Sequence, residues 1–152
     1  MEQNPFESPP VNSAPPKGIF LSRIGLGIAC AMFLLSLCGS AIISRTGASF
    51  GDMGINCLLL GMGYLAWYAN PYIFLAGLSL FKRWHLLSVG CAAIAIVLSL
   101  TALRIREIEI NEAGIKEPVT GYGWGYYLWL GSSITLLLTA LACLAFEREK
   151  SN

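Results

Sequence analysis

Charged residues are scarce in this chain and are absent from long stretches of it. Of 152 residues, 10 are Lys or Arg, 9 are Asp or Glu, and one is His. The net charge of +1, without a basic stripe, excludes a nucleic-acid-binding protein, which needs clustered cations to contact phosphates. The hydrophobic content of 55% excludes an intrinsically disordered protein.

Side chains that usually take part in catalysis or metal binding are few. All five cysteines fall in apolar stretches, and no pair has the spacing of a metal site or indicates a disulfide-built secreted domain. The histidine, His85, directly follows Lys82–Trp84, and such a group of cations and aromatics typically anchors a helix at a membrane boundary. No nucleophile motif or assembled acid–base pair is recognisable. We therefore expect no enzyme, no cofactor and no metal site.

Four runs contain no charged residue, and each is long enough to cross a membrane. A hydrocarbon core of about 30 Å takes roughly 20 helical residues. Only helices and closed barrels satisfy their backbone in lipid, and strand-like segments are too few for a barrel. The sequence therefore predicts an all-α integral membrane protein, a bundle of four transmembrane helices. The runs are Ile24–Ile43, Met53–Phe81, Leu86–Leu103 and Trp124–Phe146, and the predicted spans are about 20–43, 54–81, 86–104 and 124–146.

The residues that flank the runs predict a tail and an orientation. Residues 1–18 hold five of the seven prolines, so we expect a disordered tail before a membrane domain at 19–147. Cations near span ends are enriched on the cytoplasmic side. Six flank the side with both termini and four flank the other, which favours cytoplasmic termini. The six are Lys17, Arg23, Lys82, Arg83, Arg148 and Lys150, and the four are Arg45, Arg104, Arg106 and Lys116.

The loop at 105–123, on the outer face in this orientation, has a pattern of its own. Apolar and charged residues alternate in Glu107–Ile110, Asn111–Gly114 favours a turn, and the apolar pattern resumes in Ile115–Val119. These features predict a short hairpin, which would need support from the bundle or a partner. The alternate glycines in 121–125 predict a flexible connection to the last span.

Neutral polar residues inside the runs are the candidate functional positions. Asn70 and Pro71 interrupt the second run, where proline removes a backbone hydrogen bond and kinks a helix. Freed carbonyls at such a break can hold a ligand. Thr135 and Thr139 belong to a small, weakly polar face of the last run, and we favour helix packing as its role. That face is Gly131, Thr135, Thr139 and Ala142, and a similar row in the first run is Gly25, Ala29, Ser36 and Ser40.

Three segments carry a resemblance. Asn4–Pro9 resembles the Asn-Pro-aromatic-x-Ser/Ala-Pro opening of many small bacterial multi-span proteins. Trp67–Pro71 and Gly123–Leu130 resemble segments of uncharacterised four-span bacterial inner-membrane proteins. The resemblance implies a bacterial inner-membrane location and no particular activity. A claudin-like protein is disfavoured, because the paired cysteines of its outer loop are missing.

These observations favour a non-enzymatic multi-pass membrane protein that acts through protein contacts, as an accessory, assembly, regulatory or immunity-type subunit. Its expected partners are the lipid bilayer and either another membrane protein or a second copy of the chain. The tail and the hairpin are the expected contact surfaces. The alternative is a small oligomeric transporter or channel for a neutral or lipid-like molecule, suggested by Asn70 and Pro71 and by the Ser/Thr face of the last run with Thr135 and Thr139. A third, less favoured class is a lipid-handling enzyme that uses the loop glutamates Glu107, Glu109, Glu112 and Glu117.

Overall fold

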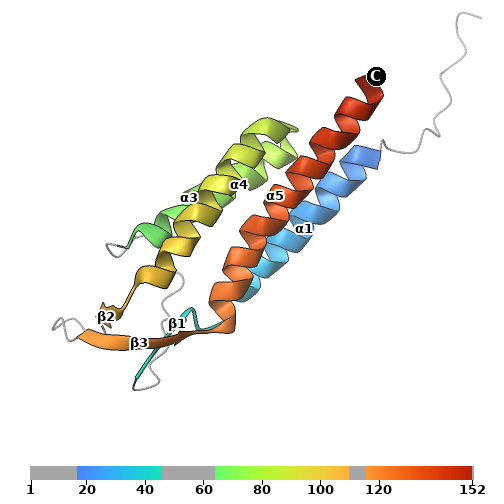
Figure 1. The fold of residues 1–152 in the computed structure, drawn as a ribbon. Helices are drawn as coiled ribbons and strands as arrows, with labels where there is room; N and C mark the ends of the chain where they lie inside the picture. The colour runs from blue at the N-terminus through green and yellow to red at the C-terminus, as the bar shows by residue number, and fades with distance from the viewer. Residues whose placement is uncertain (1–16, 46–63, 110–115, 152) are drawn as a thin grey trace, which may run out of the picture.

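The computed structural model describes residues 17–45, 64–109 and 116–151. The described chain is mostly helical, and its helices form one elongated bundle (Figure 1). The helices are α1 (Lys17–Ser36), α3 (Ala69–Phe81), α4 (His85–Leu100) and α5 (Trp124–Ser151), with the 3-10 helices η1 (Leu65–Tyr68) before α3 and η2 (Thr101–Arg104) after α4.

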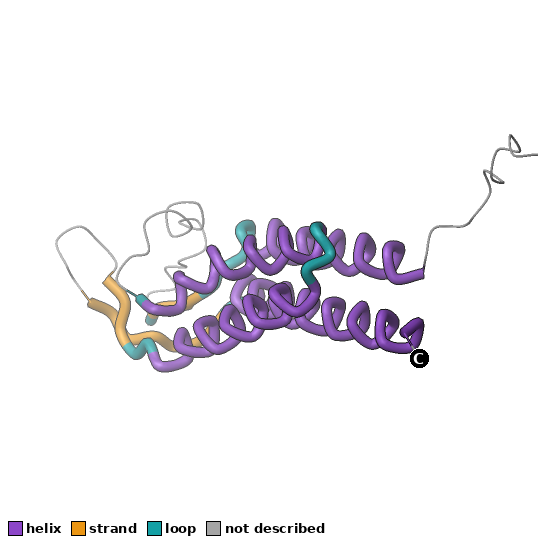
Figure 2. The backbone as a smooth tube through the Cα atoms, turned by 90° about the horizontal axis from the view of Figure 1, so that it is seen from above, coloured by secondary structure: helices purple, strands orange, loops and turns teal. Residues whose placement is uncertain are grey.

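A small sheet lies across one end of the bundle. It consists of β1 (Ile42–Ser44), β2 (Glu107–Glu109) and β3 (Lys116–Tyr122), in the order β1-β3-β2. Both pairs are antiparallel, with Ile42 opposite Tyr122 and Ile108 opposite Glu117. The strands gather at the end of the helices that lies away from the C-terminus (Figure 2).

Three of the described helices are long and apolar enough to cross a membrane. Large apolar side chains on their outer faces are exposed, as expected for a surface that contacts lipid tails rather than water. The structure is therefore that of a helical membrane protein, with membrane-length helices within three of the four predicted spans. They are Gly18–Ser36, His85–Arg104 and Trp124–Glu149, and a shorter apolar helix covers Leu65–Phe81.

The first predicted span is too long at its C-terminal end. The sequence predicts a helix over 20–43, but α1 ends at Ser36 and the chain continues into strand β1. Ser36 Oγ donates a hydrogen bond to the Phe33 backbone oxygen at 2.6 Å, and such bonds compete with the regular backbone pattern. Gly39 lies three residues later, and the Trp124 ring packs so closely against it that a Cβ there would force the ring to shift.

Two other predictions reach residues outside the described ranges. The predicted tail at 1–18 is too long, because α1 already begins at Lys17; the rest of that tail, 1–16, lies outside the described residues. Of the predicted span 54–81, the part from Leu65 to Phe81 is helical, and residues 54–63 lie outside the described residues.

The strands of the predicted hairpin are present, although the loop is more extensively structured than predicted. β2 and β3 pair as an antiparallel ladder, and the predicted turn at 111–114 lies outside the described residues. The third strand, β1, is not predicted, because its two isoleucines stand at the end of a uniformly apolar run. The predicted flexible connection at 121–125 is wrong, since β3 leads into α5 with only Gly123 between them.

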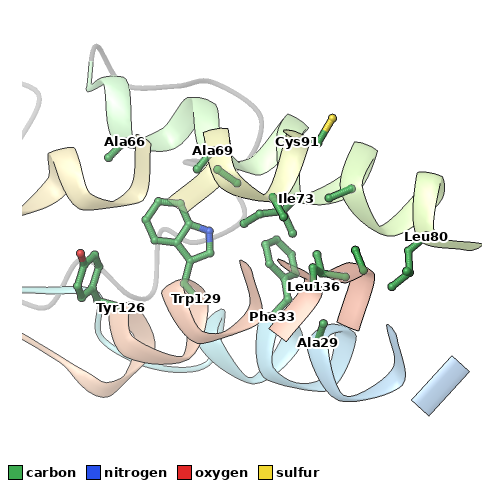
Figure 3. Close-up of a cluster of buried hydrophobic side chains, with 14 of the residues drawn as sticks. Ala29, Phe33, Ala66, Ala69, Ile73, Leu80, Cys91, Tyr126, Trp129 and Leu136 are labelled. Atoms are coloured by element: carbon green, nitrogen blue, oxygen red, sulfur yellow. The ribbon is translucent and has the colours of Figure 1, made fainter. Parts of the chain in front are cut away.

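The core lies between α3 and α4 on one side and α1 and α5 on the other (Figure 3). Trp129 of α5 points toward η1 and α3, and its ring centroid is 5.6 Å from that of Trp67. Small residues at the helix contacts allow the backbones to approach closely. The fully buried alanines at these contacts are Ala69, Ala76, Ala92, Ala95 and Ala140.

Candidate functional site

Asn70 and Pro71 lie at the start of α3. Asn70 is buried, and its Oδ1 accepts a hydrogen bond from Trp129 Nε1 at 2.8 Å, which joins α3 to α5. Pro71 is exposed and lies in the first turn of α3, which begins directly after η1. A proline is tolerated there because the amide hydrogens of the first turn have no partner inside the helix. The Asn70 side chain is thus engaged within the bundle.

Thr135 and Thr139 lie where α5 packs against α1. Thr135 Oγ1 donates to the Gly131 backbone oxygen at 2.9 Å, and Thr139 Oγ1 donates to the Thr135 backbone oxygen at 2.7 Å. Thr139 also contacts Gly25 so closely that a Cβ there would overlap its side chain. Both hydroxyls are therefore used within α5, and the small faces of the two helices meet.

The structure brings a different set of polar residues together at the opposite end of the bundle from the sheet. They surround a pocket of about 480 Å³, which is a volume typical of small-molecule sites. All four α-helices or their ends contribute to its lining. The polar and charged side chains around it are Ser22 and Arg23 of α1, Arg83 after α3, His85 of α4, and Glu147 of α5.

Among the polar and charged side chains named above, His85 is the most buried. It is the first residue of α4 and is only 6% exposed. Its Nε2 lies 3.2 Å from Oε1 of Glu147, which is 58% exposed. Its Nδ1 is buried and has no hydrogen-bond partner among the described residues. A buried polar atom without a partner is costly, and a ligand at this site could supply one.

Arg83 occupies an unusual backbone position beside His85. The amide nitrogens of Arg83 and Trp84 donate to the oxygens of Leu80 and Ser79, at 3.1 and 2.8 Å, which completes a Schellman motif after α3. The motif requires a positive φ at its penultimate position, and Arg83 has a φ of 65°. Glycine is the usual residue there, because a Cβ makes the left-handed conformation unfavourable.

An apolar groove of about 510 Å³ continues from this pocket between α1 and α3. Leu26 and Phe81 line both the pocket and the groove, so the two are adjacent. The groove offers almost only carbon and sulfur atoms to an occupant. Its other lining residues are Ala29, Cys30, Phe33, Leu34, Leu37, Ile73, Phe74, Gly77, Leu78 and Leu136.

The pocket is the part of the candidate site that the sequence does not predict. His85 and Arg83 are recognisable as boundary residues, but nothing in the sequence places Glu147 beside His85. Of the loop glutamates, Glu107 is exposed, Glu117 is half-buried, and Glu112 lies outside the described residues. Over 17–45, 64–109 and 116–151, no group of three His, Cys, Asp or Glu is placed to hold a metal ion.

At the sheet end, Tyr122 fixes β3 to the bundle. Its hydroxyl donates to the backbone oxygen of Ala102 at 3.0 Å, with Ile105 O at 3.4 Å as a second acceptor. Burial raises the pKa of Tyr122 above its usual value, and the nearby Tyr127 raises it further. The hydroxyl therefore stays protonated and able to donate at neutral pH.

Comparisons of the chain with protein-family models, with curated proteins and with solved structures find no match.

Proposed function

We propose that this chain is a non-enzymatic multi-pass protein of a bacterial inner membrane that acts through protein contacts, as an accessory, assembly, regulatory or immunity-type subunit. The observation that carries the proposal is the sheet held across one end of the bundle (Figure 1). A sheet outside the membrane-spanning helices presents backbone edges and charged side chains to a partner.

The attachment of the sheet to the bundle supports this role. The backbone nitrogens of Gly123 and Gly125 donate to the oxygens of Ala41 and Ser40, both at 3.1 Å, which ties the end of β3 to the approach to β1. Ile108 of β2 is buried. A surface that is ordered before binding loses less conformational entropy when a partner docks. Exposed charges at this end are Arg45, Arg104, Arg106, Glu107 and Lys116.

The orientation of the sheet belongs to the same proposal. Ser22 Oγ donates to the Leu80 backbone oxygen at 3.4 Å, so the start of α1 and the end of α3 share one end of the bundle. The excess of Lys and Arg around that end favours the cytoplasmic side. The sheet would then face the outer side of the membrane, where it would meet its partner.

Affinity purification tests the contact surface directly. The full-length tagged chain is purified in mild detergent from its native membrane, and co-purifying proteins are quantified by mass spectrometry. We expect a near-stoichiometric partner that is lost when Arg45→Glu and Arg106→Glu reverse two exposed charges beside the sheet. The matched control, Lys82→Glu with Arg148→Glu at the other end, should retain it. A partner retained equally by both variants, or a chain purified without any partner, would contradict the proposal.

The alternative function, a small oligomeric transporter or channel for a neutral or lipid-like molecule, has less support. Asn70 Oδ1 and the hydroxyl hydrogens of Thr135 and Thr139 are engaged in hydrogen bonds within the bundle, which leaves these side chains fewer polar groups to offer to a pathway. Solute flux into liposomes that contain the purified chain tests this alternative. Flux that Asn70→Leu abolishes in folded protein would support transport over protein contact.

A further inference from the structure

We infer that the pocket and the adjoining groove bind one anionic phospholipid of the surrounding membrane, with its phosphate at Arg23 and Arg83 and one acyl chain in the groove between α1 and α3. This inference goes beyond protein contact at the sheet and does not depend on it. The two surfaces lie at opposite ends of the bundle, so their tests are separate.

The dimensions of the groove fit an acyl chain of one leaflet. Along α1 its lining extends from Leu26 to Leu37. At 1.5 Å per helical residue this is roughly 16 Å, about half of a 30 Å hydrocarbon core. Leu26 and Phe81, which line both spaces, mark the place where the polar pocket gives way to the apolar groove. A lipid with its headgroup in the pocket would therefore leave its chain in the groove.

The charges of the pocket fit an anionic headgroup. Arg23 and Arg83 both line the pocket. The planar donors of an arginine side chain suit phosphate oxygens. The single carboxylate of the pocket, Glu147, already faces the imidazole of His85. In the proposed orientation this end lies in the cytoplasmic leaflet, which is rich in anionic lipids.

Two independent features indicate that the pocket is built for a ligand. Arg83 keeps a large cationic side chain at a left-handed position that glycine would occupy at lower cost, and unfavourable backbone conformations concentrate at functional sites. His85 Nδ1 is buried without a partner in the part of the chain that the structure describes, while the other ring nitrogen faces Glu147. A phosphate oxygen in the pocket would give this ring a second polar contact.

Lipid binding to the purified full-length chain tests the inference. The delipidated protein is titrated in detergent with phosphatidylglycerol or with phosphatidylcholine of identical acyl chains, and bound lipid is counted by native mass spectrometry. We expect one phosphatidylglycerol to bind, about tenfold or more tightly than phosphatidylcholine. Both lipids offer a phosphate for charge-assisted contacts, but only phosphatidylglycerol carries a net negative charge.

Two variants separate the headgroup site from the groove. Arg23→Gln with Arg83→Gly should remove the preference for phosphatidylglycerol, and the glycine is compatible with the Schellman motif. Gly77→Leu places a side chain in the groove, where the nearest atom is the flexible Leu26 side chain, and should weaken binding of both lipids. Helix content and melting temperature in lipid-free detergent verify that both variants fold.

The matched control removes two arginines from the other end of the bundle, by Arg104→Gln with Arg106→Gln. It should leave both lipid affinities unchanged, because neither residue lines the pocket or the groove. Equal affinity for the two lipids would overturn the inference. So would an equal loss of the preference in the control, or a preference that survives the change at Arg23 and Arg83.

Discussion

Several buried polar side chains in this bundle bond either to a neighbouring helix or to the backbone of their own helix. Asn70 joins α3 to α5 through Trp129, and Ser88 Oγ donates to the Ala76 backbone oxygen at 2.9 Å, which joins α4 to α3. Sequence spacing places Thr135 and Thr139 on one packing face, because both lie within a single helix. It cannot pair Asn70 with Trp129 or His85 with Glu147, since those contacts depend on how separate helices pack.

The Asn70–Trp129 hydrogen bond gives a prediction at the residue scale. Asn70→Leu would leave the buried indole N–H without its acceptor and should lower the free energy of unfolding by about 1–2 kcal/mol. Denaturant unfolding in detergent, followed by circular dichroism, measures the change. Trp129→Phe in the same background removes the stranded donor, so the double variant should lose less than the two single variants together. Strictly additive losses would show that the bond contributes nothing.

At the scale of elements, the described helices follow the charge-free runs, whereas their ends follow local contacts. The run from Trp124 begins where α5 begins, and the run before Arg104 coincides with α4 and η2. The first run contains both a helix and a strand, because a uniformly apolar segment has no periodicity to separate the two. The alternate glycines at the β3–α5 junction predict a flexible connection. A Cβ at Gly123 would overlap the Ser40 backbone, so this glycine serves close packing.

The α1–α5 contact gives a matched pair of glycine variants. Gly25→Ala would drive a methyl group into Thr139, whereas nothing lies within 4 Å of a Cβ at Gly27. We expect Gly25→Ala to lower stability by about 1–3 kcal/mol through overpacking. Gly27→Ala should be neutral or slightly stabilising. Thermal unfolding in detergent distinguishes them, and Thr139→Ala should partly rescue Gly25→Ala. Equal behaviour of the two variants would contradict the packing described for this helix pair.

The attachment of the sheet gives a prediction with a pH dependence. Tyr122→Phe removes the hydrogen bond to Ala102 and should lower stability by about 1 kcal/mol at neutral pH. Because burial raises the pKa of Tyr122 in the folded state, its contribution is fully present below the unfolded value of about 10. The contribution is lost as pH rises through the folded pKa. The stability difference between the native chain and Tyr122→Phe should therefore be constant up to about pH 10 and shrink above it. A difference that grows at alkaline pH would contradict this account.

On the scale of the whole molecule, the bundle has two ends with different characters. One end carries the sheet, and the end of α5 lies at the other (Figure 2). The polar pocket is lined there by residues from the start of α1, the α3–α4 connection and the last turns of α5. The sequence predicts this division in outline, through the hairpin pattern between two apolar runs and the Lys and Arg counts. It does not predict the pocket, which requires four helix ends to meet.

The central claim is that the helices cross a membrane with the sheet on one side and the pocket on the other. Site-directed labelling tests it in a background without the five native cysteines. Arg45→Cys and Pro118→Cys report the sheet end, and Lys82→Cys and Glu149→Cys report the other end; all four positions are exposed. The reagent is a maleimide that crosses the permeable outer membrane of intact cells but cannot cross the proposed inner membrane. In intact cells it should label positions 45 and 118. It should label positions 82 and 149 only after the inner membrane is disrupted. Labelling of all four positions from the same side would contradict the account.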